Sequence, residues 1–386
     1  MIQTNKKIPF WRNSRILTII AQVIILAIVV AIFIFFGNNL ANNFRRLGLN
    51  FGFDFLSRNA SFDIANPPFE FSPTDPYFKA ILVGLVNSLQ VMFFGIILAT
   101  IIGITVGIGR LSNNWLIRKL ATIYVETLRN TPLLLQLFFW YFAVFLKLPR
   151  IENSLNVGNT IYLSNRGMSI PWFVTNGQTV LSFIVIITAI ISAIFFWRKR
   201  INVIEETGAS GKNWLYLLIG SSIVAVATFF LGIDWNLPQY ENNSIAGGIN
   251  LSPEFATLLI GLSIYTASFI AEVVRAGIQS VSKGQWEAAR ALGLKPGLVM
   301  QLVIFPQALR VMIPSLTSEY LNLAKNSSLA IAIGYNDVYA ISNTISNQTG
   351  KAVEILLILV SIYLIINLII SLAMNRLNKS VQLKER

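Results

Sequence analysis

Residues 282–297 read SKGQWEAARALGLKPG and lie between two long apolar runs of the chain. The stretch predicts a short helix, because Ser282 and Gln285 can form a capping box at its start and Pro296 with Gly297 would stop it. Very small side chains fill its middle, so another protein could approach its backbone closely. These small residues are Ala288, Ala289, Ala291 and Gly293. From these residues alone, a helix lying on lipid headgroups is an equally good interpretation.

Apolar runs recur along the rest of the chain at nearly regular intervals. We count eight, and each is long enough, at about 20 residues or more, to cross roughly 30 Å of hydrocarbon. They cover residues 16–36, 78–108, 121–146, 179–197, 214–232, 255–281, 308–334 and 353–374. The composition agrees, since 54% of the residues are hydrophobic and only 12% are charged. The sequence therefore predicts an all-α integral membrane protein with about eight transmembrane helices.

The distribution of Lys and Arg predicts how these helices are oriented. With the N-terminus inside, the inside segments hold 19 Lys and Arg and the outside segments hold 7. Cytoplasmic loops of membrane proteins collect these residues. Both termini are therefore predicted to be cytoplasmic. The first run is expected to be retained as a helix, because it is too long for a signal peptide and lacks a small-residue cleavage site.

Several classes of function are disfavoured by what the chain lacks. It has no Cys and no His, so we expect no metal site, no cofactor and no catalytic residue. The net charge of +13 is typical of cytoplasmic loops here, and it does not form a basic surface for nucleic acid. The nearest approach to a phosphate-binding loop, residues 208–213, lacks the required first Gly and ends in Asn213. The chain is therefore not expected to bind or hydrolyse ATP.

The stretch quoted first resembles the EAA loop of ABC importer permeases. The resemblance consists of Glu287-Ala288-Ala289, Gly293 after three residues, and Val303, Phe305 and Pro306 further on. The family pattern has Ile and Leu where this chain has Val303 and Phe305, which are conservative departures. In that family the loop is the coupling helix that seats in the ATPase subunit. The resemblance therefore implies a set of coupling residues: Glu287, Ala288, Ala289, Arg290, Gly293 and Lys295.

Three further segments are similar to the polar amino acid branch of that family, whose members carry His, Glu, Gln, Arg or L-amino acids in general. They are residues 124–136 (YVETLRNTPLLLQ), 265–279 (YTASFIAEVVRAGIQ) and 322–329 (NLAKNSSL). With the EAA loop they cover five of the predicted spans, which implies the five-helix core of a type I importer. Residues 76–386 are thus interpreted as the importer's transmembrane domain. A first helix with a long outside loop (residues 1–75) and a helix pair at about 179–232 are additions, as in longer permeases of this branch.

The resemblance implies a permease subunit of an ATP-driven amino acid importer in a bacterial inner membrane. It also implies partners: a second permease subunit, two cytoplasmic ATPase subunits and an extracytoplasmic amino-acid-binding protein, besides membrane lipid. The alternative that the sequence leaves open is an ion-coupled secondary transporter or channel.

Polar residues inside predicted spans are candidates for the path of the solute, because such groups are costly in lipid and tend to face a cavity or each other. Glu319, Asn322 and Asn326 recur at helical spacing in residues 308–334, with Lys325 on an adjacent strip. Ser268 and Gln136 are further candidates. The alternative is a structural polar seam between two permease subunits.

Four other charged residues are predicted to form internal ion pairs. Glu272 and Arg275 are one helical turn apart, as are Glu126 and Arg129. We therefore expect two local pairs near the cytoplasmic side and not a ligand site.

Overall fold

The computed structural model describes residues 14–46, 51–241 and 243–381. Within these residues, seven helices are long and apolar enough to cross a membrane. They are Ile16–Asn39, Tyr77–Arg110, Gly177–Ile204, Lys212–Gly232, Pro253–Gln279, Pro296–Ile333 and Ala352–Val381. The prediction of a helical membrane protein is confirmed. The predicted cytoplasmic termini concern residues 1–13 and 382–386, which lie outside the described residues.

The centre of the molecule is a bundle built on α2 (Tyr77–Arg110), α7 (Pro253–Gln279), α10 (Phe305–Asn326) and α12 (Ala352–Val381). Glycines allow α2 and α7 to pack closely. A Cβ at Gly103 would lie 2.5 Å from Ile270 Cγ2, and one at Gly107 would lie 2.8 Å from the carbonyl oxygen of Ala271. Small residues are a common means of helix contact in membranes, where lipid removes most of the hydrophobic driving force between helices.

The predicted third span, residues 121–146, is wrong as a single helix. The structure has α3 (Trp115–Asn130) and α4 (Leu133–Phe138), followed by two short helical segments, η3 (Phe139–Val144) and η4 (Phe145–Lys147). The break falls at Thr131, whose ψ of 126° is extended. Pro132 explains it, because a proline disfavours the helical conformation of the residue before it. In the part of the chain that the structure describes, seven helices are therefore long enough to span a membrane, where eight were predicted.

The loops on one side of the bundle contain short helical elements. The first outside loop carries a 3-10 turn, η2 (Asp54–Ser57), and it buries Phe55 and Ala60 against the outer ends of α2 and α11 (Val338–Thr349). Helix α11 was not predicted, because its residues are too polar and too few to form a span. Asp337 caps it by accepting a hydrogen bond from the Ala340 amide at 2.7 Å.

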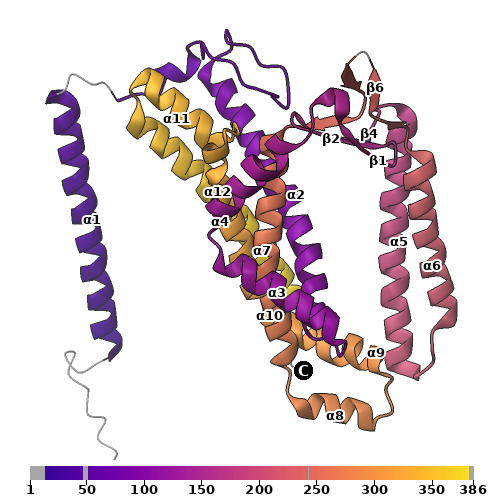
Figure 1. Cartoon of the computed structure of the whole chain (residues 1–386). Helices are drawn as coiled ribbons and strands as arrows, with labels where there is room; N and C mark the ends of the chain where they lie inside the picture. The colour runs from indigo at the N-terminus through magenta and orange to yellow at the C-terminus, as the bar shows by residue number, and fades with distance from the viewer. Residues whose placement is uncertain (1–13, 47–50, 242, 382–386) are drawn as a thin grey trace, which may run out of the picture.

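The predicted helix pair is present as α5 (Gly177–Thr207) and α6 (Lys212–Ala227) and stands apart from the central bundle (Figure 1). Short strands gather at its upper end (Figure 1). They are β1 (Leu155–Val157), β2 (Ile161–Ser164), β3 (Gly167–Ile170), β4 (Trp172–Phe173), β5 (Trp235–Asn236), β6 (Gln239–Glu241), β7 (Ser244–Ala246) and β8 (Ile249–Leu251). The four-stranded sheet has the antiparallel order β1-β2-β3-β8, with β4-β5 and β6-β7 as separate pairs.

Two elements define the opposite end of the molecule. Helix α8 (Lys283–Ala291) and α9 (Pro296–Leu298) hang below the bundle, far from the strands (Figure 1). Helix α1 (Ser14–Arg46) stands apart from the bundle, and most of its described side chains are exposed.

Candidate coupling and translocation sites

Helix α8 is the predicted helix of the first quoted stretch, but its ends differ from the prediction. The capping box does not form, since Ser282 makes no side-chain cap bond and the Gln285 side chain accepts from Gln307 Nε2 at 3.2 Å. The helix ends before Gly293, whose φ is +75°, and the Leu294 amide donates back to the Ala289 carbonyl at 3.3 Å. A left-handed glycine after the last turn is a common helix stop. Pro296 instead begins α9.

One face of α8 anchors the helix and the other is free. Ala289 is 3% exposed, and Trp286 packs against the same core cluster. Glu287, Ala288 and Arg290 are exposed, as are Gly293 and Lys295. Leu292 is 80% exposed at the end of the helix. It lies outside the predicted spans, so lipid does not explain its exposure. The free face therefore combines small residues, one exposed leucine and charges, which suits contact with another protein.

Helix α10 carries four of the predicted path residues on a face that the rest of the chain covers only in part. Asn322 and Lys325 are exposed, and Glu319 and Asn326 are half-buried. The rest of the helix surface at this level is packed, because Tyr320, Leu323 and Ala324 are buried in the central bundle. A polar face in the membrane that is partly open on a single chain must meet water, a solute or another subunit.

Ser268 and Gln136 lie elsewhere. Ser268 is fully buried and donates to the Tyr265 carbonyl at 2.6 Å, within its own helix. Gln136 is 5% exposed, and its Nε2 donates to the carbonyls of Leu128 and Thr131, both at 2.9 Å. These carbonyls end α3 at the Thr131 break, so Gln136 satisfies backbone groups that the break leaves free. The geometry favours structural roles for both residues.

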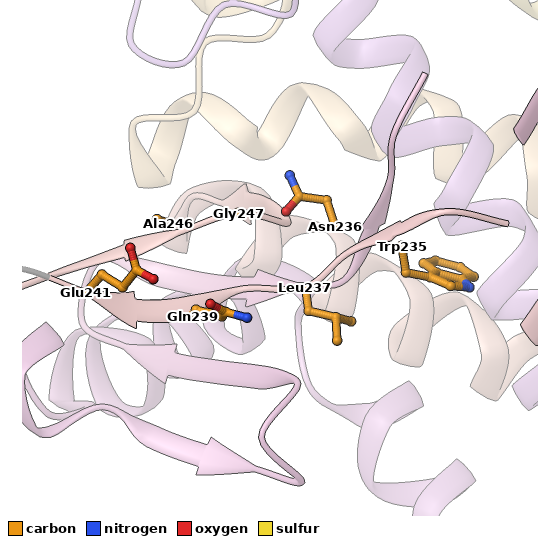
Figure 2. Close-up of a pocket in the computed structure, with 7 residues that line it drawn as sticks. All are labelled: Trp235, Asn236, Leu237, Gln239, Glu241, Ala246 and Gly247. Atoms are coloured by element: carbon orange, nitrogen blue, oxygen red, sulfur yellow. The ribbon is translucent and has the colours of Figure 1, made fainter. Parts of the chain in front are cut away.

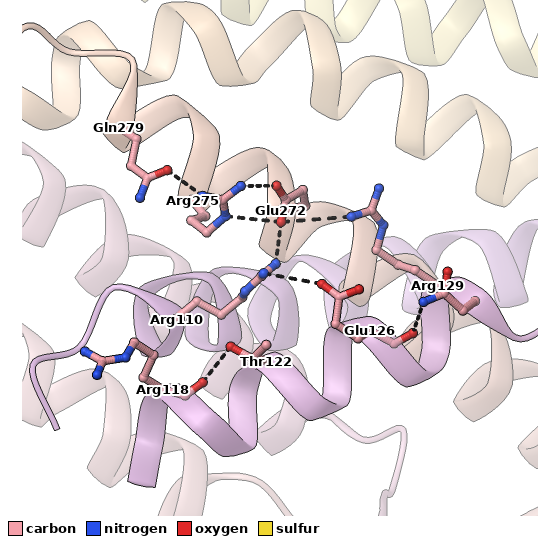
Figure 3. Close-up of polar contacts among 9 residues, drawn as sticks. Arg110, Arg118, Thr122, Glu126, Arg129, Glu272, Arg275 and Gln279 are labelled. Carbon is pink, nitrogen blue, oxygen red and sulfur yellow. Dashed lines mark hydrogen bonds and ion pairs between the residues drawn. The ribbon is translucent and has the colours of Figure 1, made fainter. Parts of the chain in front are cut away.

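The predicted Glu272–Arg275 pair is present, and it is part of a larger network with Arg110, Arg129 and Glu126 (Figure 3). Glu272 contacts Arg110 and Arg275, and it lies 4.0 Å from Arg129. Glu126 contacts Arg110 at 3.6 Å, so the expected Glu126–Arg129 pair is replaced by contacts with other helices. The network joins α2, α3 and α7. Sequence spacing indicates only partners within a helix, which is why the role of Arg110 was missed.

Two buried carboxylates were also missed by sequence reasoning. Glu354 is 1% exposed at the start of α12, where it accepts from Lys351 Nζ at 3.1 Å and from the Gly52 amide at 3.2 Å. Asp337 is fully buried, and burial raises its pKa to about 7. Each residue holds a loop or helix end together, and neither belongs to a recognisable motif.

Comparison with known proteins identifies the architecture. Residues 95–383 match the family described as binding-protein-dependent transport system inner membrane component. The general L-amino acid transport system permease protein AapQ of Rhizobium johnstonii is 42% identical, over 96% of this chain and 93% of that protein. The glutamate/glutamine/aspartate/asparagine transport system permease protein BztB of Rhodobacter capsulatus is 38% identical, over 97% of this chain and 96% of that protein. This chain belongs to the family of binding-protein-dependent transport system inner membrane components.

Proposed function

We propose that this chain is a permease subunit of an ATP-driven importer of polar amino acids. The observation that carries the proposal is the similarity to AapQ and BztB over more than nine-tenths of the chain, including its added segments. Both relatives are named as amino acid transport system permeases. The exposed face of α8 and the partly covered polar face of α10 are the two surfaces that such a subunit needs, one for coupling and one for the solute.

The ATPase activity belongs to separate subunits in this proposal. Two cytoplasmic ATPase subunits make the contacts, one with α8 of this chain and one with the equivalent helix of a second permease subunit. An extracytoplasmic protein delivers the amino acid. The residues that meet the ATPase are Glu287, Ala288, Ala289, Arg290, Gly293 and Lys295. Of these, Ala289 acts through packing, since its side chain is buried against the bundle.

The packing supports a way for α8 to move the bundle. Helix α8 follows α7 after a short turn at Ser280, and the Gln285–Gln307 hydrogen bond links it to α10. Closure of the ATPases on ATP pushes α8, and α7 and α10 then turn together. The polar face of α10, with Glu319, Asn322, Lys325 and Asn326, opens alternately to the two sides of the membrane. The carboxylate and ammonium groups on that face match the two charges of a zwitterionic amino acid.

Reconstitution tests the proposal. The chain, its partner permease, the ATPase subunits and the binding protein are placed in proteoliposomes, and uptake of labelled amino acids is measured. We expect uptake that requires ATP inside and binding protein outside. Uptake that continues without ATP while an ion gradient is held would instead support an ion-coupled secondary transporter.

A further inference from the structure

A pocket of about 360 Å³ lies among the short strands at the upper end of the helix pair (Figure 2). It is lined by Trp235, Asn236, Leu237, Gln239, Glu241, Ala246 and Gly247, all from the segment between α6 and α7. The strands lie at the end of the molecule opposite α8 (Figure 1). If α8 meets cytoplasmic ATPases, as in the proposed function, this pocket faces the outside of the cell.

The shape of the pocket is built by close backbone contacts. Gly247 has a φ of +79°, and a Cβ there would lie 2.5 Å from the Leu237 carbonyl oxygen and 2.7 Å from Asn236 Oδ1. The Trp235 indole N–H donates to the Phe229 carbonyl at 3.1 Å, and its ring packs against Phe229 at 5.1 Å. The wall formed by Trp235 is therefore held in place before any ligand arrives.

The charge of the segment is unusual for this chain. Residues 233–254 contain three acidic residues and no Lys or Arg, although the whole chain carries +13. Two of the acids are occupied, since Asp234 accepts from Asn176 Nδ2 and Glu254 accepts from the Tyr141 hydroxyl, both at 2.8 Å. Within the described residues, the Glu241 carboxylate has no ion pair and no hydrogen bond. The pocket thus presents a free negative charge.

The chemistry of the lining selects a cation. Glu241, at one end of the lining, supplies a carboxylate that suits an ammonium or guanidinium group, Asn236 and Gln239 supply amide oxygens, and the indole of Trp235 forms a wall at the other end (Figure 2). A free amino acid is a poor ligand, because its carboxylate would find no positive partner in the lining and would be repelled by Glu241. A Lys or Arg side chain of a protein brings the cation without that carboxylate.

We propose that this pocket receives a Lys or Arg side chain of the amino-acid-binding protein when that protein docks. The inference rests on the proposed function, which requires such a protein on the outer side. It assigns a role to the segment that the helix pair α5 and α6 carries. Docking through a single exposed charge contributes modestly to affinity and more to orientation and association rate.

The test uses the complete importer in proteoliposomes or nanodiscs and measures ATP hydrolysis as binding protein is added. For Glu241→Gln, we expect the half-stimulating concentration of binding protein to rise about two- to fivefold, with a larger rise for Glu241→Lys. Saturating binding protein should restore stimulation. The difference between wild type and Glu241→Gln should shrink at high salt, since salt screens exposed charges. Glu70→Lys is the matched control, because Glu70 is an exposed acid on a different outer loop.

Three outcomes would overturn the inference or its basis, and they can be told apart. Equal half-stimulating concentrations for wild type, Glu241→Lys and Glu70→Lys would remove the docking role and leave the permease function intact. Saturable binding of labelled arginine to the importer without binding protein, lost in Glu241→Gln, would make the pocket a solute site instead. A wild-type importer that no amino-acid-binding protein stimulates would contradict the proposed function itself.

Discussion

Gly293 fixes the end of α8, and its replacement should uncouple the importer if α8 docks on the ATPase as proposed. Its φ of +75° costs an L-residue about 1–2 kcal/mol, and a Cβ at this position would meet no atom within 4 Å, so added bulk would project toward a partner. We expect Gly293→Leu to insert normally but to lose co-purification with the ATPase and most uptake. Gly208→Leu is the control, since Gly208 has a φ of +68° and equally open surroundings at the end of α5. Normal ATPase binding by Gly293→Leu would contradict the assignment.

Substitutions of Glu319 and Lys325 distinguish the two interpretations of the polar face of α10, a path for the solute or a structural seam between subunits. If they line the path, Glu319→Gln and Lys325→Met should each lower uptake at least tenfold while assembly and basal ATP hydrolysis persist. A seam mutant would instead lose yield, because removing one partner of a buried polar pair costs a few kcal/mol. Glu354→Gln is the control for such a loss of yield, since Glu354 is buried against Lys351 and the Gly52 amide. Intact uptake by both path variants would refute the path.

Asp337 should make stability depend on pH. Burial raises the pKa of Asp337 to about 7, well above the usual value of an aspartate. A raised carboxyl pKa means that the folded state prefers the protonated form, so its stabilising contribution is present below pH 4 and is lost as pH rises through 7. Asp337→Asn keeps the cap on the Ala340 amide without the charge. The difference in melting temperature, variant minus wild type, should therefore increase between pH 5 and pH 8. A difference that stays constant with pH would contradict this prediction.

At the scale of elements, the Glu272 network should hold α2, α3 and α7 together. Removing its central charge leaves Arg110, Arg129 and Arg275 facing one another with only Glu126 nearby. We expect Glu272→Gln to destabilise the detergent-solubilised protein by about 1–3 kcal/mol, seen as a lower melting temperature. Glu126→Gln is the matched control. Its side chain is 56% exposed, so its loss should cost under about 1 kcal/mol. Equal shifts for the two variants would show that Glu272 is not the centre.

Helices that form long apolar runs could be predicted from the sequence. Elements that depend on tertiary contacts could not. The long spans and α8 are visible as apolar runs and as a motif. The break at Thr131 was signalled by Pro132 and by the polar residues before it, and the predicted span was drawn across both signals. Helix α11 and the eight strands are short, so their stability comes from packing on neighbours and not from their own pattern. For the same reason the tertiary role of Arg110 and the backbone role of Gln136 could not be read from spacing.

At the scale of the whole molecule, the outer loops with their short strands and helix α8 lie at opposite ends (Figure 1). The first outside loop packs onto α2 and α11, and the strands gather above α5 and α6, whereas α8 lies at the other end (Figure 1). This arrangement agrees with the charge count, because the loops with few Lys and Arg share the strand end. One membrane plane can therefore lie between the two sets of loops.

Cysteine labelling tests that orientation directly, since the chain has no native Cys. Ser61, Asn159 and Asn243 mark the outer loops, but each has a positive φ that a cysteine would strain. Exposed neighbours are better positions: Thr74, Asn153 and Ser244 for the strand end, and Ser210 for the α8 end. In intact spheroplasts, a membrane-impermeant maleimide should label the first three within minutes and Ser210→Cys only after lysis. Labelling of Ser210→Cys in intact spheroplasts, with the other three protected, would show that the orientation is the reverse. Helix α8 would then face away from any cytoplasmic ATPase, and the coupling assignment would fail with it.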